Sequence, residues 1–204
     1  MRAVPVLLIL VGCASAPPPR VDLGAGWPQV APDYETAHAK WTRRGGYSDD
    51  WSRIVETAAT LQAPEWRAAY VRERARRLRM GPEAEAELQA SQRAETEAVW
   101  RVELLVATAK LEWNDLRKGK DSMWRVALVG AGGVEVPALS IKEDRRPRSE
   151  IASYFPDLSH FFNAYTVTFP VMTDDGRPVI DENTKQVVLK VGSAVGAVEL
   201  VWSE

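Results

Sequence analysis

Between residues 33 and 120 the apolar residues recur every three or four positions, the spacing of helices that bury one face. Asp33 is suited to cap a first helix, which Gly45 and Gly46 would end. A second helix is predicted from about Ser48 to the residue before Pro64, because proline disfavours helix in the residue that precedes it. Its buried stripe would consist of Trp51, Ile54, Val55, Ala58, Ala59 and Leu61.

A helical hairpin and a long central helix are predicted next. Pro64 suits the first position of a helix that runs to about Met80, and the pair Gly81 and Pro82 is typical of one helix ending and another beginning. The run from Glu83 to about Leu116 contains no glycine or proline and would be about 50 Å long as one helix. Its second half is apolar on two sides, so we expect a buried central helix there.

From about residue 121 the pattern changes to the alternation that is typical of strands. Strands are predicted at residues 124–129, 134–142, 162–171, 186–191 and 197–202. Residues 143 to 150 form a charged segment around Pro147, which predicts a mobile loop. The predicted fold class is α+β, with a helical region at 33–120 that contains the long central helix. A small antiparallel sheet or sandwich follows at 121–204, and we expect residues 32–204 to share one core.

The first residues have the layout of a secretion signal. Arg2 is followed by an apolar run, Val4 to Val11, that is too short to span a bilayer as a permanent helix. Residues 10 to 13 (Leu10, Val11, Gly12 and Cys13) resemble the lipobox of bacterial lipoproteins. The resemblance implies a signal peptide at 1–12, cleavage before Cys13 and a lipid on the Cys13 sulfur. The alternative is an ordinary secretory signal cut near Ala14 to Ala16, which would discard Cys13.

The lipobox resemblance also implies where the protein lies. Two or more acyl chains anchor a protein stably in a bilayer. Ala14 differs from the aspartate of inner-membrane lipoproteins, so we expect the outer membrane, with the body on its periplasmic face. Residues 13–32, with three consecutive prolines and two more at Pro28 and Pro32, are predicted to be an extended tether. Because Cys13 is the single cysteine, the body would contain no disulfide.

Charge and composition narrow the class of partner. The chain has 26 basic and 28 acidic residues, so its formal net charge is only −2. A nearly neutral chain has no strong field to attract nucleic acid, and we do not expect DNA or RNA as its partner.

An arginine cluster is the most conspicuous group of charges. Arg72, Arg76 and Arg79 would lie on one face of the predicted helix and could form a site for anions. The alternative is a solvated helical hairpin, in which these arginines face acidic residues of the next helix, Glu83, Glu85 and Glu87. The sequence favours the solvated hairpin.

Aromatic and titratable residues predict little chemistry. Of eight tryptophans, all but Trp27 fall on apolar stripes, so we expect them in the core. Catalysis by a histidine could draw only on His38 and His160, and no nucleophile motif accompanies them. The acidic turns around Asp174 and Asp181 do not match a calcium loop, and no metal or cofactor is expected.

The sequence therefore predicts a membrane-anchored envelope lipoprotein that is not an enzyme. We expect a structural, assembly or protein-binding role, with another envelope protein or a surface polymer as the partner and the membrane contacted through Cys13. A peptidoglycan-binding or glycan-binding lipoprotein is one alternative, and a periplasmic hydrolase is another. Exposed aromatic rings in a groove would favour the glycan binder, and a pocket with a histidine against carboxylates would favour the hydrolase.

Overall fold

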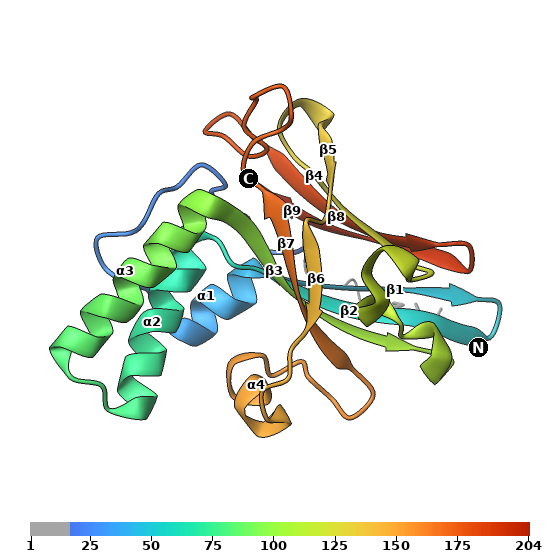
Figure 1. Cartoon of the computed structure of the whole chain (residues 1–204), viewed down its shortest axis with the longest axis horizontal. Coiled ribbons are helices and arrows are strands. Elements are labelled where there is room, and N and C mark those ends of the chain that lie inside the picture. Colours follow the sequence, from blue (N-terminus) through green and yellow to red (C-terminus); the bar gives the residue numbers. More distant parts are fainter. Residues whose placement is uncertain (1–16) are drawn as a thin grey trace, which may run out of the picture.

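The computed structural model describes residues 17–204, which form two antiparallel sheets and a group of helices (Figure 1). The five-stranded sheet has the order β1-β2-β3-β7-β6, and the four-stranded sheet has the order β5-β4-β8-β9. The strands of the first sheet are β1 (Thr42–Asp49), β2 (Ser52–Leu61), β3 (Val99–Thr108), β6 (Ser140–Glu143) and β7 (Asn163–Pro170). The strands of the second are β4 (Arg125–Val129), β5 (Glu135–Pro137), β8 (Gln186–Ser193) and β9 (Gly196–Ser203).

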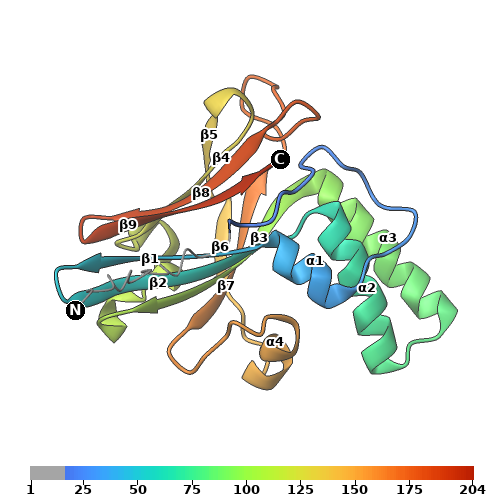
Figure 2. The same cartoon turned by 180° about the vertical axis from the view of Figure 1, so that it is seen from behind.

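The helices are shorter than predicted and lie beside the sheets. They are α1 (Tyr34–Trp41), α2 (Pro64–Leu78), α3 (Pro82–Ala98) and α4 (Arg148–Tyr154), with short 3-10 turns at Leu111–Trp113, Leu116–Asp121 and Ala131–Gly133. The α2–α3 hairpin projects to one side of the sheets, and the view from behind in Figure 2 shows the same arrangement. The predicted hairpin at Gly81 and Pro82 is present, although the left-handed residue that ends α2 is Arg79.

The prediction of an N-terminal helical half with a long central helix is wrong. The predicted second helix is the strand β2, and the run from Glu83 to Leu116 is the helix α3 followed by the strand β3. Both strands are covered on two faces, so each contains five consecutive buried positions, over which the alternation that marks a strand disappears. Their β-branched residues, among them Val55, Thr57, Val102 and Val106, were the signal that favoured strands.

Gly45 does not end a helix, although the sequence predicted that it would. It lies in the middle of β1, paired with Thr57 of β2. A side chain at this position would place its first carbon 2.8 Å from the Leu200 side chain of β9. The absence of a side chain therefore lets the edge strands of the two sheets approach closely.

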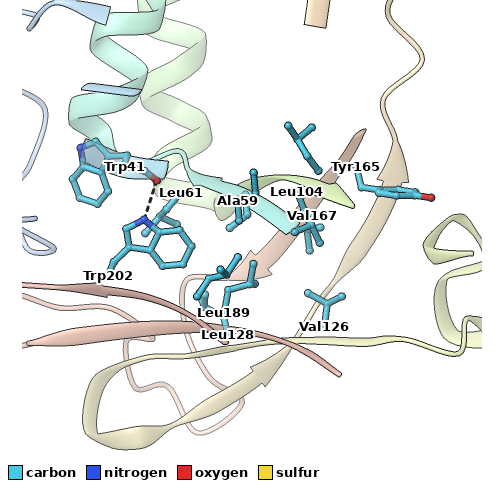
Figure 3. Close-up of a cluster of buried hydrophobic side chains, with 14 of the residues drawn as sticks. Trp41, Ala59, Leu61, Leu104, Val126, Leu128, Tyr165, Val167, Leu189 and Trp202 are labelled. Carbon is cyan, nitrogen blue, oxygen red and sulfur yellow. Dashed lines mark hydrogen bonds between the residues drawn. The ribbon is translucent and has the colours of Figure 1, made fainter. Parts of the chain in front are cut away.

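The core lies between the two sheets (Figure 3). Leu104 of β3 and Val167 of β7 face Leu128 of β4 and Leu189 of β8, and all four are fully buried. At one edge of the core the Trp202 indole nitrogen donates a hydrogen bond of 2.8 Å to the backbone oxygen of Trp41. These contacts join the last strand to the first helix.

The described part of the predicted tether packs against the body. Val21 and Leu23 are buried, and the Val21 backbone nitrogen donates to the Ser203 oxygen at 2.9 Å. Arg43 of β1 donates to the Pro19 oxygen at 2.7 Å. The chain therefore packs against the folded unit at residues 19–23, within the stretch predicted to be an extended tether. No helix among the described residues is long and apolar enough to cross a membrane.

Candidate functional site

A polar cavity lies on the outer face of the five-stranded sheet, the face that points away from the core between the sheets. Its volume is about 240 Å³. Helices α2 and α3, strands β3 and β7 and the segments that follow β2, β6 and α4 contribute its walls. The lining residues are Gln62, Trp66, Tyr70, Gln92, Arg101, Glu103, Asp144, Arg146, Phe155 and Thr166.

Glu103 is the central group of this cavity. Because side chains alternate along a strand, Leu104 points into the core and Glu103 points to the outer face of β3. Glu103 is only 2% exposed, and one carboxyl oxygen, Oε2, accepts a hydrogen bond of 3.2 Å from the Thr166 hydroxyl. The other oxygen, Oε1, is buried and has no partner among the described residues. Burial, followed by the nearby charge of Asp144, raises the pKa of Glu103 to about 8.

Asp144 and Arg146 form an ion pair on the wall that follows β6. The Arg146 Nε lies 2.9 Å from Asp144 Oδ2 and 3.1 Å from Oδ1. Partial burial acts to raise the Asp144 pKa, but the hydrogen bonds and charge of Arg146, with a smaller contribution from Glu103, outweigh it and the pKa is lowered. Burial likewise acts to lower the Arg146 pKa, and the Asp144 carboxylate outweighs it, so that pKa is raised. Asp144 is therefore charged at neutral pH while Glu103 is mostly neutral.

A second cluster of charges closes the cavity toward the helical hairpin. Arg67 of α2 is fully buried, and its guanidinium donates to the Gln62 backbone oxygen at 2.9 Å, to Gln92 at 2.8 Å and to Glu95 at 2.7 Å. Arg101 of β3 forms an ion pair with the same carboxylate of Glu95. This network joins α2, α3 and β3, and it fixes the position of Arg101 in the cavity wall.

Three cavity residues have a buried polar atom without a hydrogen-bond partner in the described part of the chain. These atoms are Trp66 Nε1, Arg101 Nε and Glu103 Oε1. Buried polar atoms normally have partners, since leaving one unpaired costs about 1 to 3 kcal/mol. The concentration of such atoms in one cavity indicates a site for a polar ligand or for ordered water.

The Trp66 ring in the cavity wall is covered on both faces by other aromatic rings. The Trp66 ring stacks on Tyr70 with centroids 5.3 Å apart and on Phe155 with centroids 5.7 Å apart. A sugar ring would need an open aromatic face to stack on. Trp66 therefore offers no open face to a sugar, and it gives no support to the glycan-binding alternative.

The predicted lipidation and signal-peptidase residues, Leu10, Val11, Gly12 and Cys13, lie outside the described residues. The structure therefore gives no information on the lipobox.

The predicted anion cluster is only partly assembled. Arg72 and Arg76 line a cavity of about 150 Å³, whereas Arg79 ends α2 and is not in its wall. Asp33 and Glu73 line the same cavity, and Arg76 donates to Glu73 at 2.8 Å. Carboxylates on the wall disfavour an anion there.

The arginines of α2 do not pair with the acidic residues at the start of α3, although the predicted hairpin required it. Arg77 pairs with Glu73, Arg67 with Glu95 and Arg74 with Glu150. The three acidic residues expected to face them, Glu83, Glu85 and Glu87, form no ion pair with the described residues. The two helices of the hairpin are therefore joined by the buried Arg67 rather than by exposed pairs at the turn.

The two histidines do not enter the cavity. His38 is buried, and its Nε2 lies 3.5 Å from Asp157 Oδ2 and 3.3 Å from the Thr42 hydroxyl. The Thr42 hydroxyl also lies 3.5 Å from His38 Nδ1, so it is almost equally far from both ring nitrogens and is not aligned with one of them as the nucleophile of a catalytic relay is. His160 is exposed. Among the described residues, no group of three or more His, Cys, Asp or Glu side chains is placed to hold a metal ion.

The tryptophan prediction is partly wrong. Trp41, Trp66, Trp124 and Trp202 are buried, but Trp51 is 99% exposed at the turn between β1 and β2. The error follows from the assignment of a helix to β2. Trp27, for which no core position was predicted, lies under the Arg93 guanidinium, 5.0 Å from its ring centroid.

The sequence contained one signal for the cavity. Glu103 is a lone charge within an apolar run, Val102 to Val106. A buried charge in such a run is costly unless it has a role, so its position pointed to a site. Its neighbours Asp144 and Arg146 come from the segment that was predicted to be a mobile charged loop. Their proximity to Glu103 depends on the pairing of β3, β7 and β6 and has no local signature.

Comparison with known proteins gives no relative. No protein-family model matches the chain, and neither the curated proteins nor the solved structures contain a significant match.

Proposed function

We propose that the protein is an envelope lipoprotein, anchored in the outer membrane through a lipid on Cys13, whose role is to bind a partner without transforming it. The cavity around Glu103 is the place where a polar group of that partner is held. The observation that carries this proposal is the presence of three unpartnered buried polar atoms, from Trp66, Arg101 and Glu103, in one cavity.

The size and rigidity of the cavity support binding of a small group. Pockets for drug-sized ligands have volumes of about 300 to 1,000 Å³, so a cavity of about 240 Å³ suits a small molecule or the end of a longer one. Its walls are held by the Asp144–Arg146 pair and by the buried Arg67 network. A preformed site loses little entropy when it binds.

The anchor is tested separately from the cavity. Mass spectrometry of the native protein is expected to show a chain that begins at Cys13 and carries acyl chains. An unmodified Cys13, or a chain that begins beyond it, would contradict the lipoprotein part of the proposal.

The cavity is tested by site-specific photocrosslinking in the full-length protein in cells. We expect p-benzoylphenylalanine in place of Tyr70, which lines the cavity, to give a discrete adduct. The matched control replaces Tyr47, a tyrosine of β1 that lies outside the cavity. Glu103→Ala should abolish the Tyr70 adduct in a protein that still folds. Equal adducts at both tyrosines, or none at Tyr70, would contradict binding at the cavity.

A periplasmic hydrolase is the second candidate, and one observation favours it. Glu103 and Asp144 line one cavity and their pKa values are shifted in opposite directions, which is typical of an acid and base pair. Against it, Asp144 is bound by Arg146 and Glu103 is 2% exposed. Turnover of a model ester or glycoside that falls at least about 100-fold in Glu103→Gln would establish the hydrolase.

A further inference from the structure

The unpartnered atoms of the Glu103 cavity have a common polarity. Trp66 Nε1 carries a hydrogen and can only donate. Arg101 Nε also can only donate, and one terminal nitrogen of this guanidinium, Nη2, already pairs with Glu95. A ligand that satisfies both residues must therefore present oxygen acceptors.

Glu103 adds a third donor when it is neutral. Its Oε2 accepts a hydrogen bond from Thr166, and the neutral carboxyl can donate one hydrogen bond, either to a ligand or to the neighbouring Asp144 carboxylate. The raised pKa of Glu103 keeps this neutral form populated at pH 7. The cavity then offers hydrogen-bond donors from Trp66, Arg101 and Glu103.

We infer that this cavity binds a carboxylate, supplied either by a small free acid or by the carboxyl terminus of a peptide. The inference rests on the proposed binding function and names the chemistry of its ligand. A carboxylate has about four acceptor positions on two oxygens, enough for all three donors. Hydrogen bonds that involve an ionised group are also the stronger ones.

A cationic ligand fits less well. An ammonium group carries only donors and would leave Trp66 and Arg101 unpaired. The guanidinium groups of Arg101 and Arg146, which line the cavity, would also repel it. The Asp144 carboxylate is the one fixed negative charge of the cavity wall, and Arg146 neutralises it.

The binding of a carboxylate should depend on pH through Glu103. The groups that face Glu103 come from each element around it: Arg101 on β3, Asp144 and Arg146 after β6, Tyr70 on α2, and Glu95 on α3 through Arg101. The remaining cavity residues near Glu103 do not titrate: they are Gln62 after β2, Thr166 on β7 and Phe155 after α4. Loss of the Glu103 proton would remove a donor and add a negative charge beside the ligand. Affinity for carboxylates should therefore fall as the pH rises through about 8.

The experiment follows the indole N–H resonance of Trp66 in the NMR spectrum of the full-length lipidated protein, with the resonance assigned by its loss in Trp66→Phe. The probes are N-acetylglycine, its neutral amide N-acetylglycinamide, and methylamine. We expect the acid to shift this resonance downfield, as a new hydrogen bond does, with an affinity at least about tenfold above that of the amide.

Glu103→Gln is the decisive variant. Its amide keeps a donor but cannot titrate between pH 6.5 and 9.5. It should therefore bind N-acetylglycine at all these pH values, whereas the affinity of the parent protein should fall at least about tenfold over that range. Loss of binding in Glu103→Gln at pH 6.5, or an unchanged pH profile, would overturn the inference.

The remaining outcomes separate this inference from the proposed function. A Tyr70 adduct in cells together with equal binding of acid and amide, a preference for methylamine, or no bound probe would overturn the carboxylate alone and leave the binding function intact. If acetate binds as tightly as acetyl-triglycine, the ligand is a small free acid. If the peptide binds at least about tenfold more tightly, the ligand is a carboxyl terminus.

Discussion

The two faces of strand β3 contribute to different parts of the molecule. Val102, Leu104 and Val106 point into the core between the sheets and are fully buried. On the other face Arg101 and Glu103 line the polar cavity, and Leu105, the next residue of that face, is buried and apolar. One ten-residue strand therefore contributes to the stability of the sandwich on one side and to the candidate site on the other. Substitution of a core-facing residue of β3 should therefore change stability, and substitution of a neighbouring cavity residue should change binding.

The largest effect is expected on the inner face. Leu104→Ala removes a side chain that is 0% exposed and leaves a cavity against the opposite sheet, at a cost of about 2 to 5 kcal/mol in the free energy of unfolding. Urea unfolding measures this cost. The folded fraction should still bind N-acetylglycine. A loss below about 1 kcal/mol, or a loss of binding in protein that remains folded, would show that the two faces are not separable.

On the outer face, Glu103→Gln should change how stability depends on pH. The folded-state pKa of Glu103, about 8, lies above the value of about 4.3 for an unfolded chain. The unfolded state therefore loses its proton first, and the parent protein becomes less stable as the pH rises from about 4.5 to 8. The slope should approach about 1.4 kcal/mol per pH unit and flatten above pH 8.

The glutamine variant should lack this slope, because its side chain does not titrate. Its stability relative to the parent protein should therefore increase from pH 4.5 to pH 8. Thermal or urea unfolding at several pH values measures the difference. Parallel pH profiles for the two proteins would mean that Glu103 titrates normally in the folded state.

Elements with a local sequence signal were predicted correctly, and strands buried on both faces were not. The α2–α3 hairpin was predicted because Pro64, Gly81 and Pro82 mark its ends locally. The C-terminal strands were predicted from their alternation and their turns. Strands β2 and β3 were missed because partners on both faces bury consecutive residues, which mimics the pattern of a buried helix.

The sequence contains even less information about which residues meet in the cavity than about strands β2 and β3. Glu103 and Asp144 are 41 positions apart, and their proximity follows from the pairing of β3 with β7 and of β7 with β6. That pairing is set by tertiary contacts between distant segments. The sequence could have flagged Glu103 as an unusual charge, but it could not have supplied its partners.

A smaller effect is expected for the hydrogen bonds of Arg67, which connect the cavity wall to helices α2 and α3. Arg67→Met keeps the volume of a long side chain but removes its hydrogen bonds to Gln62, Gln92 and Glu95. We expect a loss of about 1 to 3 kcal/mol, since Glu95 keeps Arg101 as a partner. Urea unfolding measures it, with the exposed Arg72→Met as the control. Equal stability of the two variants would mean that the network does not hold the hairpin to β3.

The smallest effect is expected at Trp51, which the sequence placed in the core and the structure leaves 99% exposed. Trp51→Ser should change the free energy of unfolding by less than about 0.5 kcal/mol, because exposed side chains contribute little. The matched control is Trp202→Phe, which removes the hydrogen bond from the indole to Trp41 and should cost at least about 1 kcal/mol. If Trp51→Ser were as destabilising as Trp202→Phe, the end of the β1–β2 hairpin would be packed. The assignment of Trp51 to solvent would then be wrong, and so would the assignment of core and solvent faces at this end of the sandwich.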